Sequence, residues 1–381
     1  MTPMRIGFDA TSAVRQGAGI GRITRELLRA LAQRDAAHSY RLIYAAPPGA
    51  AAQPLPPLGR NFHVRRLPFD DLWLARVWHR ARLPLPVNLV TGGIDLFHAP
   101  DFTLPPVLPG TRTVLTVHDL SFVRDPESAL PVLRRYLNQV VPRSVRRATH
   151  VLADSEATRN DLAALYGTPR EKITVLYSGV NAMFQPVRDA DRLAAVRLRY
   201  GIGAAPYVLA VSTLQPRKNY PRLIQALARQ PDPSLRLVIV GGKGWLYDAI
   251  FAEVGRSGLE GRVIFAGFAA DEDLPALYSG ARVVAYPSTY EGFGLPILEG
   301  YACGTPVVTS TAACLPEVAG GAALLVDPLD VDAIATALHQ AASDETLRAS
   351  LIARGFERVR PFTWDNAAKQ LLEVYGAVGG K

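Results

Sequence analysis

The sequence predicts an α/β protein of two doubly wound domains, each a parallel sheet covered by helices on both faces. Three observations lead to this prediction. The chain has 381 residues, which is more than one hydrophobic core usually organises. Short aliphatic runs alternate with helical periodicities over most of its length, as they do in parallel sheets. The pattern then restarts after residues 185–203, a stretch that contains Pro186 and ends in Gly-Ile-Gly, as domain boundaries often do.

The first half begins with a short buried strand over 5–9, followed by a glycine-rich turn. Apolar residues at helical spacing then predict a helix over 20–33. Another helix is expected over 155–165, because a Ser or Asp cap opens it and Gly167 closes it. Further strands are predicted at 40–45, 96–98, 113–116, 150–153 and 173–176. Residues 46–94 are rich in Pro and Ala and break this alternation.

The second half repeats the scheme. Its strands are predicted at 207–211, 236–240, 263–266, 282–285, 306–309 and 323–326. Helices are predicted at 220–228, 248–253, 271–280, 295–302 and 330–341. The domains are therefore expected to span residues 1–185 and 186–361, followed by a C-terminal segment over 362–381.

Composition narrows the class of protein. With 49% hydrophobic and 20% charged residues, the chain is expected to be compact and globular. No apolar run reaches the roughly 18–20 residues that span a bilayer, and the N-terminus does not have the pattern of a signal peptide. Cys303 and Cys314 do not form a Cys-x-x-Cys pair, which argues against a disulfide framework and a zinc site. We expect inert thiols in a reducing cytoplasm.

Positive charge is concentrated in the first half. Residues 1–185 hold 23 Arg and Lys against 14 Asp and Glu, a net charge of +9, whereas residues 186–381 have a net charge of −1. The first half is therefore expected to face an anionic partner, either a phospholipid surface, a diphosphate-carrying acceptor or nucleic acid. A basic surface without a specific partner explains the charge equally well. Nucleic acid is disfavoured, because no recognised binding module accompanies the charge.

Two basic stretches suit a peripheral contact with an anionic membrane, which would place the protein at the inner face of that membrane. One spans residues 72–82 and mixes two tryptophans with three arginines: Trp73, Arg76, Trp78, Arg80 and Arg82. The other places Arg135, Arg143 and Arg146 near one face of a helix over 133–147, which Pro142 is expected to interrupt. A solvated helix face over a core is the alternative for both.

The segment Glu291-Gly-Phe-Gly-Leu-Pro-Ile-Leu-Glu299 follows a predicted strand and opens a predicted helix. Gly292 and Gly294 let a ligand approach the backbone closely. The N–H groups from Phe293 to Leu295 would then face an anion or a hydroxyl at the positive end of the helix.

The two glutamates of this segment suit different tasks. Glu291, ahead of the helix, can face positive charge that develops at a sugar ring. Glu299, one turn into the helix, can accept hydrogen bonds from a ribose diol. An ordinary helix cap beside a solvated glutamate is the alternative, and the Gly-Phe-Gly-Leu-Pro sequence between the glutamates favours the functional interpretation.

A pair of cations follows the first strand of the second half. In the segment 212–219, Arg217 and Lys218 precede Asn219 and a predicted helix. Adjacent cations at a strand end can grip a diphosphate and neutralise it as a leaving group. Taken alone, such a pair is more often simply solvated.

In the first half, a predicted strand ends at His118-Asp119. An imidazole there can hydrogen-bond a sugar hydroxyl or stabilise a transition state, while Asp119 can orient it or accept a hydroxyl. A lone histidine is more often structural than catalytic.

The glycines Gly17, Gly19 and Gly21 lead into the first predicted helix. Their spacing is not that of a dinucleotide fingerprint, and they do not follow the first strand directly. Glycines that pack one helix closely are the alternative to a ligand loop.

The segment from Glu291 to Glu299 resembles the E-x7-E signature of family-4 glycosyltransferases, which are retaining enzymes of the GT-B fold. The likeness extends to Val263-Ile-Phe-Ala-Gly-Phe, to Gly304-Thr-Pro-Val-Val-Thr-Ser and to Leu315-Pro-Glu317. It covers residues 205–340 and, more loosely, the whole chain. The GT-B fold implies two facing Rossmann-like domains with an interdomain cleft, an acceptor-binding first domain, a donor-binding second domain and a final helix that crosses back.

The resemblance also assigns roles to residues. His118 matches the active-site histidine of the family and Lys218 its phosphate-binding lysine, with Glu291 and Asp119 completing the catalytic set. Many members carry Arg where this chain has Ser212, so Arg217 is expected to supply that charge. The donor-binding set implied is Ser212, Arg217, Lys218, Gly242, Phe293, Gly294, Leu295 and Glu299. The loop with Gly17, Gly19 and Gly21 would bound the acceptor and meet donor phosphates.

The expected reaction transfers a hexose from a nucleotide-diphosphate sugar, without a cofactor or a metal. The N-terminal stretch resembles that of bacterial polysaccharide mannosyltransferases, so GDP-mannose is the first donor expected and a UDP-sugar the second. The acceptor is expected to be a glycan or a polyprenyl-linked glycan. A dinucleotide oxidoreductase would need an acidic ribose-binding residue that is not found. A phosphorylase would need a pyridoxal-phosphate lysine and a much longer chain. A binding protein without activity would hold the donor and not turn it over.

Overall fold

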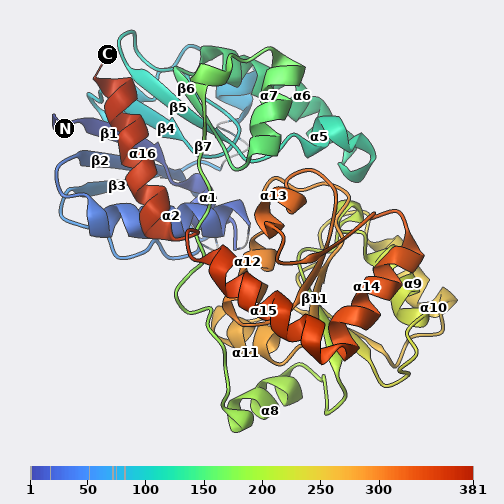
Figure 1. Cartoon of the computed structure of the whole chain (residues 1–381). Helices are drawn as coiled ribbons and strands as arrows, with labels where there is room; N and C mark the ends of the chain where they lie inside the picture. The colour runs from blue at the N-terminus through green and yellow to red at the C-terminus, as the bar shows by residue number, and fades with distance from the viewer. Residues whose placement is uncertain are drawn as a thin grey trace. The chain divides into compact units, whose positions relative to one another are not determined.

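A computed structural model of the protein describes residues 2–17, 19–50, 52–70, 73, 75–80 and 83–380. The described chain forms two compact units (Figure 1). The first comprises the residues up to Leu120, then Pro131–Gly179 and the residues from Thr363 onward. The second comprises Ser121–Leu130 and Val180–Phe362. The sequence pattern did not predict that residues 121–130 group with the second unit.

The first unit is built on a parallel sheet of seven strands in the order β3-β2-β1-β4-β5-β6-β7. The strands are β1 (Arg5–Asp9), β2 (Ser39–Ala45), β3 (Phe62–Leu67), β4 (Leu96–Ala99), β5 (Arg112–Val117), β6 (His150–Ala153) and β7 (Ile173–Val175). The strand order reverses between β1 and β4, the arrangement of a Rossmann fold.

Helices cover this sheet. They are α1 (Thr11–Arg15), α2 (Ile20–Arg34), α4 (Asn88–Thr91), α6 (Pro131–Arg147), α7 (Glu156–Tyr166) and α16 (Trp364–Gly379), with a π-helical turn η1 at Ala75–Arg80. The C-terminal helix α16 packs against α2 (Figure 1). Leu371 and Tyr375 of α16 share one core with Leu28 and Leu31 of α2. Tyr375 also holds the buried His98 of β4, with 2.7 Å between the hydroxyl and Nδ1.

Two features of the first unit differ from the sequence prediction. Strand β3 lies in the region where the alternation was broken. Four of its six residues are exposed, as suits an edge strand, so it has no apolar pattern to read. Helix α6 continues through Pro142 instead of stopping there. A proline inside a helix costs about 3 kcal/mol, and burial of Val140, Val141 and Val145 in the same turns offsets that cost.

The second unit contains a parallel sheet of six strands in the order β10-β9-β8-β11-β12-β13. The strands are β8 (Tyr207–Val211), β9 (Arg236–Val240), β10 (Val263–Gly267), β11 (Val283–Tyr286), β12 (Val307–Ser310) and β13 (Leu324–Val326). Its order reverses between β8 and β11, so this unit is also Rossmann-like.

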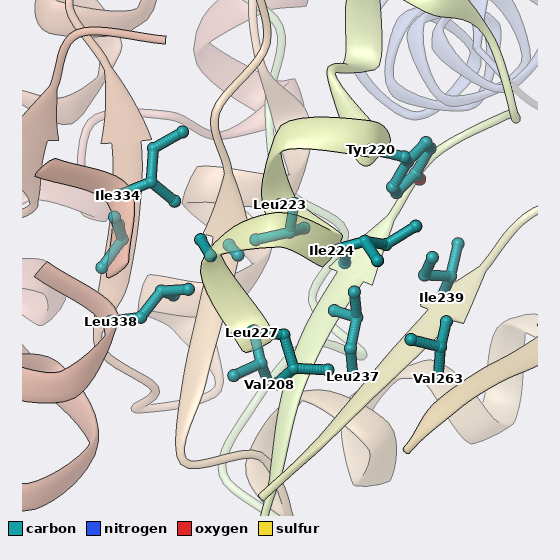
Figure 2. Close-up of a cluster of buried hydrophobic side chains, with 14 of the residues drawn as sticks. Val208, Tyr220, Leu223, Ile224, Leu227, Leu237, Ile239, Val263, Ile334 and Leu338 are labelled. Atoms are coloured by element: carbon teal, nitrogen blue, oxygen red, sulfur yellow. The ribbon is translucent and has the colours of Figure 1, made fainter. Parts of the chain in front are cut away.

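The helices of the second unit are α5 (Ser121–Arg124), α8 (Ala190–Arg199), α9 (Tyr220–Ala228), α10 (Asp248–Arg256), α11 (Leu274–Ser279), α12 (Leu295–Ala302), α13 (Leu315–Ala319), α14 (Val331–Ser343) and α15 (Glu345–Val359). Figure 2 shows how α9 turns Leu223 and Leu227 toward Val208 and Leu237 of the sheet, with Leu338 of α14 beside them. Helix α8 lies within residues 185–203, the stretch that was predicted to be a domain boundary. It buries only Val196, so its apolar periodicity is weak.

The chain passes from the first unit to the second at Gly179 and returns at Thr363, and these two passages lie against each other. A Cβ on Gly179 would lie 2.2 Å from the backbone nitrogen of Trp364, which only glycine avoids. Within the second unit, the N–H of Val180 donates to the carbonyl of Phe362 at 2.9 Å. Along the described residues, no helix combines the length and apolar character that crossing a bilayer requires.

Candidate active site

The densest group of buried charges in the second unit lies at the carboxyl ends of β8 and β11, where the strand order reverses. Ligands of open α/β sheets bind at this position. The β8 loop (residues 212–219) and the β11 loop (residues 287–294) are joined there. The N–H of Thr289 donates to the carbonyl of Arg217 at 2.8 Å, and Asn219 donates its side-chain amide to the carbonyl of Pro287 at 3.0 Å.

Glu291 is the centre of this group. Arg217 donates Nη1 to its Oε2 at 2.5 Å, and Lys218 donates Nζ to its Oε1 at 2.6 Å. Lys218 also donates to the hydroxyl of Tyr286 at 3.0 Å. Glu291 is only 5% exposed and Lys218 8%, so the pairs are shielded from water. Motifs 73 residues apart in sequence therefore form one site.

The charges set the protonation of this site. Burial alone would raise the pKa of Glu291, but the Arg217 guanidinium and the Lys218 ammonium outweigh it and lower that pKa to about 2. Burial and the neighbouring Glu291 carboxylate hold the pKa of Tyr286 well above its usual range. The Glu291 carboxylate therefore stays charged near neutral pH.

The residues after Glu291 are fixed by their backbone. Gly294 is the N-cap of helix α12, with φ near +111°, a region that favours glycine, and a Cβ there would lie 3.1 Å from Leu315. The thiol of Cys314 lies 3.1 Å from the carbonyl of Glu291 and 3.0 Å from that of Phe293, so it holds the turn from behind.

Phe293 and Leu295 differ in position. The ring of Phe293 is buried and packs against Phe362, with 6.0 Å between the ring centroids. The ring of Phe293 is thus part of the packed interior, and the donor-binding role of this residue remains a prediction. Leu295 is half-buried and is the first residue of α12.

Glu299 lies one turn inside α12 and is 3% exposed. Its Oε2 accepts a hydrogen bond from the hydroxyl of Tyr278 at 2.7 Å. Tyr278, from α11, fixes the orientation of this carboxylate, and sequence reasoning did not identify it. The ribose-binding role of Glu299 remains a prediction.

Ser212 and Gly242 lie in neighbouring loops. The hydroxyl of Ser212 is 2.7 Å from that of Tyr220, and the N–H of Leu214 donates to the carbonyl of Gly242 at 2.9 Å. A Cβ on Gly242 would meet nothing within 4 Å. The strict requirement for glycine falls on Gly241, whose φ is near +153° and whose Cβ would lie 2.0 Å from the Ser212 carbonyl.

In the first unit, His118 lies at the end of β5 and is 6% exposed. Its Nδ1 is 2.8 Å from Oδ2 of Asp154 and its Nε2 is 2.7 Å from the carbonyl of Pro100. Burial alone would lower the pKa of His118, but Asp154, Asp101 and the Pro100 carbonyl together raise it to about 9. The ring is thus an imidazolium whose two N–H groups each have an acceptor.

The carboxylate that orients His118 is Asp154, where the sequence analysis named Asp119 for this task. Asp154 follows β6, next to β5 in the sheet. The carboxyl ends of adjacent parallel strands lie side by side, so the Ala153-Asp154 pair that ends a predicted strand was the available signal. Asp119 is half-buried, and its negative charge raises the pKa of Asp154, after the larger effect of burial.

Gly17, Gly19 and Gly21 differ in their backbone conformation and contacts. A Cβ on Gly21 would lie 2.2 Å from the carbonyl of Gln16, so this glycine serves close packing of α2. Gly19 precedes α2 with φ near +57°, and a Cβ there would meet nothing within 4 Å. Gly17 offers its carbonyl to Arg25 at 2.7 Å. Of these three glycines, only Gly21 is required for close packing, and the ligand-binding role of the loop remains a prediction.

In the part of the chain that the structure describes, no cluster of three or more His, Cys, Asp or Glu side chains could hold a metal ion. Of the basic stretch 72–82, Leu72 and Arg82 lie outside the described residues. Trp73 is exposed, and Trp78 donates its Nε1 to the carbonyl of Leu85 at 2.9 Å.

Two family models match the chain: Glycosyltransferase Family 4 over residues 17–184 and Glycosyl transferases group 1 over residues 200–358. The chain is 36% identical over 283 residues to the O-antigen chain mannosyltransferase B of Escherichia coli, which covers 74% of each protein. It is 35% identical over 290 residues to a D-inositol 3-phosphate glycosyltransferase of Salinispora tropica, covering 70% of this chain and 59% of that protein.

Solved structures share the fold along nearly the whole chain. Sucrose-phosphate synthase from Thermosynechococcus elongatus is 22% identical, with a TM-score of 0.78 over 99% of both chains. Anabaena HepE, solved in complex with UDP and glucose, is 22% identical, with a TM-score of 0.74 over 98% of this chain and 100% of that one. The relatives agree with the two Rossmann-like units and with the carboxylate–cation site where β8 and β11 meet. The chain therefore belongs to the group 1, family-4 glycosyltransferases of the GT-B fold and is an enzyme of that class.

Proposed function

We propose that the enzyme transfers mannose from GDP-mannose, with retention of configuration, to a glycan or polyprenyl-linked glycan of a surface polysaccharide. The 36% identity to an O-antigen mannosyltransferase over three quarters of the chain is the observation that supports this donor. The transfer needs no cofactor and no metal ion, since fixed cations take the electrostatic task that a metal performs in other transferases.

The second unit binds the donor on this proposal. Arg217 and Lys218 hold the diphosphate and neutralise the charge that develops on it as the sugar leaves. The N–H groups around Gly294 and Leu295 face the same phosphates from the positive end of α12. Glu299, oriented by Tyr278, accepts the ribose hydroxyls.

Glu291 has two tasks on this proposal. Its carboxylate orients Arg217 and Lys218, because each cation meets a different oxygen. Its negative charge, which persists far below neutral pH, also stabilises the oxocarbenium-like sugar. Both tasks need the ionised form, which the two cations maintain.

His118 acts in the first unit as a fixed cation. Both ring nitrogens already meet acceptors, so the ring is poorly suited to exchange a proton with substrate. Its positive charge instead stabilises negative charge on the reacting groups, with Asp119 beside it to accept a sugar hydroxyl. The open backbone at Gly17 and Gly19 serves the acceptor and the donor phosphates.

Peripheral contact with an anionic membrane belongs to the same proposal. The first turn of helix α6 carries Val132, 75% exposed, and Leu133, 37% exposed, directly before Arg134 and Arg135. Apolar side chains next to arginines suit the interface of an anionic bilayer.

A donor screen tests the proposal. GDP, UDP, ADP and TDP sugars are compared by thermal shift and by release of the nucleotide. GDP-mannose should stabilise the enzyme most and be the sugar that is turned over. Stabilisation by UDP-sugars alone would refute the mannose assignment, and binding without release would point to a non-catalytic protein.

A further inference from the structure

One segment interrupts the first unit and packs with the second: residues 121–130, called the strap below. It contains α5 and a 3-10 turn over Pro126–Ser128. The chain enters it three residues after His118 and leaves it at Pro131, where α6 begins. No role has been given to it so far.

The strap holds the β11 loop. The hydroxyl of Thr289 donates to Oδ2 of Asp125 at 2.9 Å and also lies 3.2 Å from the carbonyl of Arg217. Its single proton favours the closer carboxylate. Thr289 also donates its N–H to Arg217, as described above, and it precedes Glu291 by two residues. Asp125 therefore binds the point at which the β8 and β11 loops join.

The strap also holds the β9 loop (residues 241–247). Trp245 donates Nε1 to the carbonyl of Ser128 at 2.7 Å. The next residue, Leu246, has φ near +54°, a left-handed conformation that is unfavourable for a leucine. Such conformations persist where the surroundings determine them, and the Trp245–Ser128 bond is one such restraint.

The two attachments are coupled inside the strap. The hydroxyl of Ser128 donates to the same Oδ2 of Asp125, at 2.8 Å, that Thr289 uses. One carboxylate oxygen thus fixes both the turn that carries the Ser128 carbonyl and the loop that carries Glu291.

We propose that the strap is a positioning element of the donor site and that Asp125 is its central positioning residue, acting through Thr289 on the loop of Glu291 and through Ser128 on the loop of Trp245. This rests on the proposed function, in which the β8 and β11 loops bind the diphosphate. Asp125 itself contacts neither substrate nor product on this proposal.

The test compares four variants of the full chain: Asp125→Ala, Asp125→Asn, Thr289→Val and Thr289→Ser. Asp125→Asn and Thr289→Ser keep an acceptor and a hydroxyl, so they should stay close to the wild type. Asp125→Ala and Thr289→Val should each raise the KM for the donor about tenfold and change kcat less than threefold, because a hydrogen bond to a charged group is lost outside the reacting atoms. The double variant should be no worse than Asp125→Ala alone, since Asp125→Ala already removes the contact with Thr289 that Thr289→Val would take away.

Amide hydrogen exchange, measured without any donor, forms the second arm. Asp125→Ala should speed exchange in residues 287–294 and 241–247, while Glu357→Ala, an exposed change on α15, should leave both unchanged. Unchanged exchange in Asp125→Ala, or effects of Asp125→Ala and Thr289→Val that multiply in the double variant, would overturn the proposal. If the wild type turns over none of the donor sugars, the proposed function fails, whereas the exchange arm still decides about the strap.

Discussion

Both units place a buried charge at the carboxyl end of a parallel strand, but with opposite sign at the centre. In the second unit a carboxylate, Glu291, is surrounded by two cations, and its pKa falls to about 2. In the first unit an imidazolium, His118, is surrounded by a carboxylate and a carbonyl, and its pKa rises to about 9. Each group is stabilised in its charged form by neighbours brought from adjacent strand ends. A Rossmann sheet therefore serves either sign of charge, and the loops decide which.

The comparison predicts first that the carboxylate-centred site is the more sensitive for catalysis. Lys218→Ala removes a cation from both Glu291 and the proposed diphosphate, so kcat/KM for the donor should fall about a thousandfold, roughly 4 kcal/mol. Steady-state kinetics measures it. Lys369→Ala, on an exposed position of α16, is the control and should match the wild type. Equal kinetics in the two variants would remove Lys218 from the mechanism.

The imidazolium-centred site should be the more sensitive for folding. Asp154→Asn leaves the buried His118 without its charged partner, so the free energy of unfolding should drop by about 3 kcal/mol. Urea unfolding at pH 7 measures this. Asp119→Asn should cost well under half as much, because the two ring nitrogens of His118 already meet Asp154 and the carbonyl of Pro100. A larger loss in Asp119→Asn than in Asp154→Asn would reverse the assignment of the orienting carboxylate.

The opposite pKa shifts predict that the two groups lose their contributions to stability at opposite ends of the pH range. The pKa of Glu291 is lowered from 4.5 to about 2, so its stabilisation is present above pH 4.5 and lost as the pH falls toward 2. The pKa of His118 is raised from 6.5 to about 9, so its stabilisation is present below pH 6.5 and lost as the pH rises through 9. Each is worth on the order of 3 kcal/mol at most.

Urea unfolding of the wild type and of Glu291→Gln across pH 3 to 10 separates the two contributions. The variant should no longer lose stability near the acid end of this range but should still lose it near the alkaline end. If the variant loses neither, the contributions of the two charges are not independent.

The smallest effect is expected at Tyr278, which orients Glu299. Tyr278→Phe removes one hydrogen bond and should raise the KM for the donor about fivefold, near 1 kcal/mol, with kcat unchanged. Tyr301→Phe, which loses a hydroxyl bond to the carbonyl of Ala319 instead, serves as a matched control for loss of a buried hydroxyl. Similar kinetics in both variants would mean that orientation of Glu299 is unimportant for the donor.

Much of this architecture was predictable from sequence. Strands such as Tyr207–Val211 and helices such as Leu295–Ala302 match their predicted limits, because buried parallel strands read as aliphatic runs between helical periodicities. The edge strand β3 was missed since most of its side chains face water, and α8 since it buries only one residue.

The motifs proposed to bind the donor could be located in the sequence because each is a short contiguous run. That Glu291 pairs with both Arg217 and Lys218 was not readable, since the pairing depends on β8 and β11 being neighbours in the sheet. Likewise the partners of His118 come from positions 18 and 36 residues away, at the ends of β4 and β6. The strap was missed for a similar reason, because nothing in residues 121–130 indicates the unit on which they pack.

The chain crosses between its two units more than once, and this limits which fragments and chimeras of the enzyme can fold. A fragment ending near residue 185 would lack α16, and so would lose Leu371 from the core and the Tyr375 hydroxyl that His98 requires. The same fragment would keep the strap but separate it from the loops it binds. A chimera that exchanges the first unit with that of a relative therefore has to carry α16 with this unit, preserve Gly179 against Trp364, and leave the strap matched to the host's Thr289. The first unit is inherited as three separated pieces of sequence, not as one.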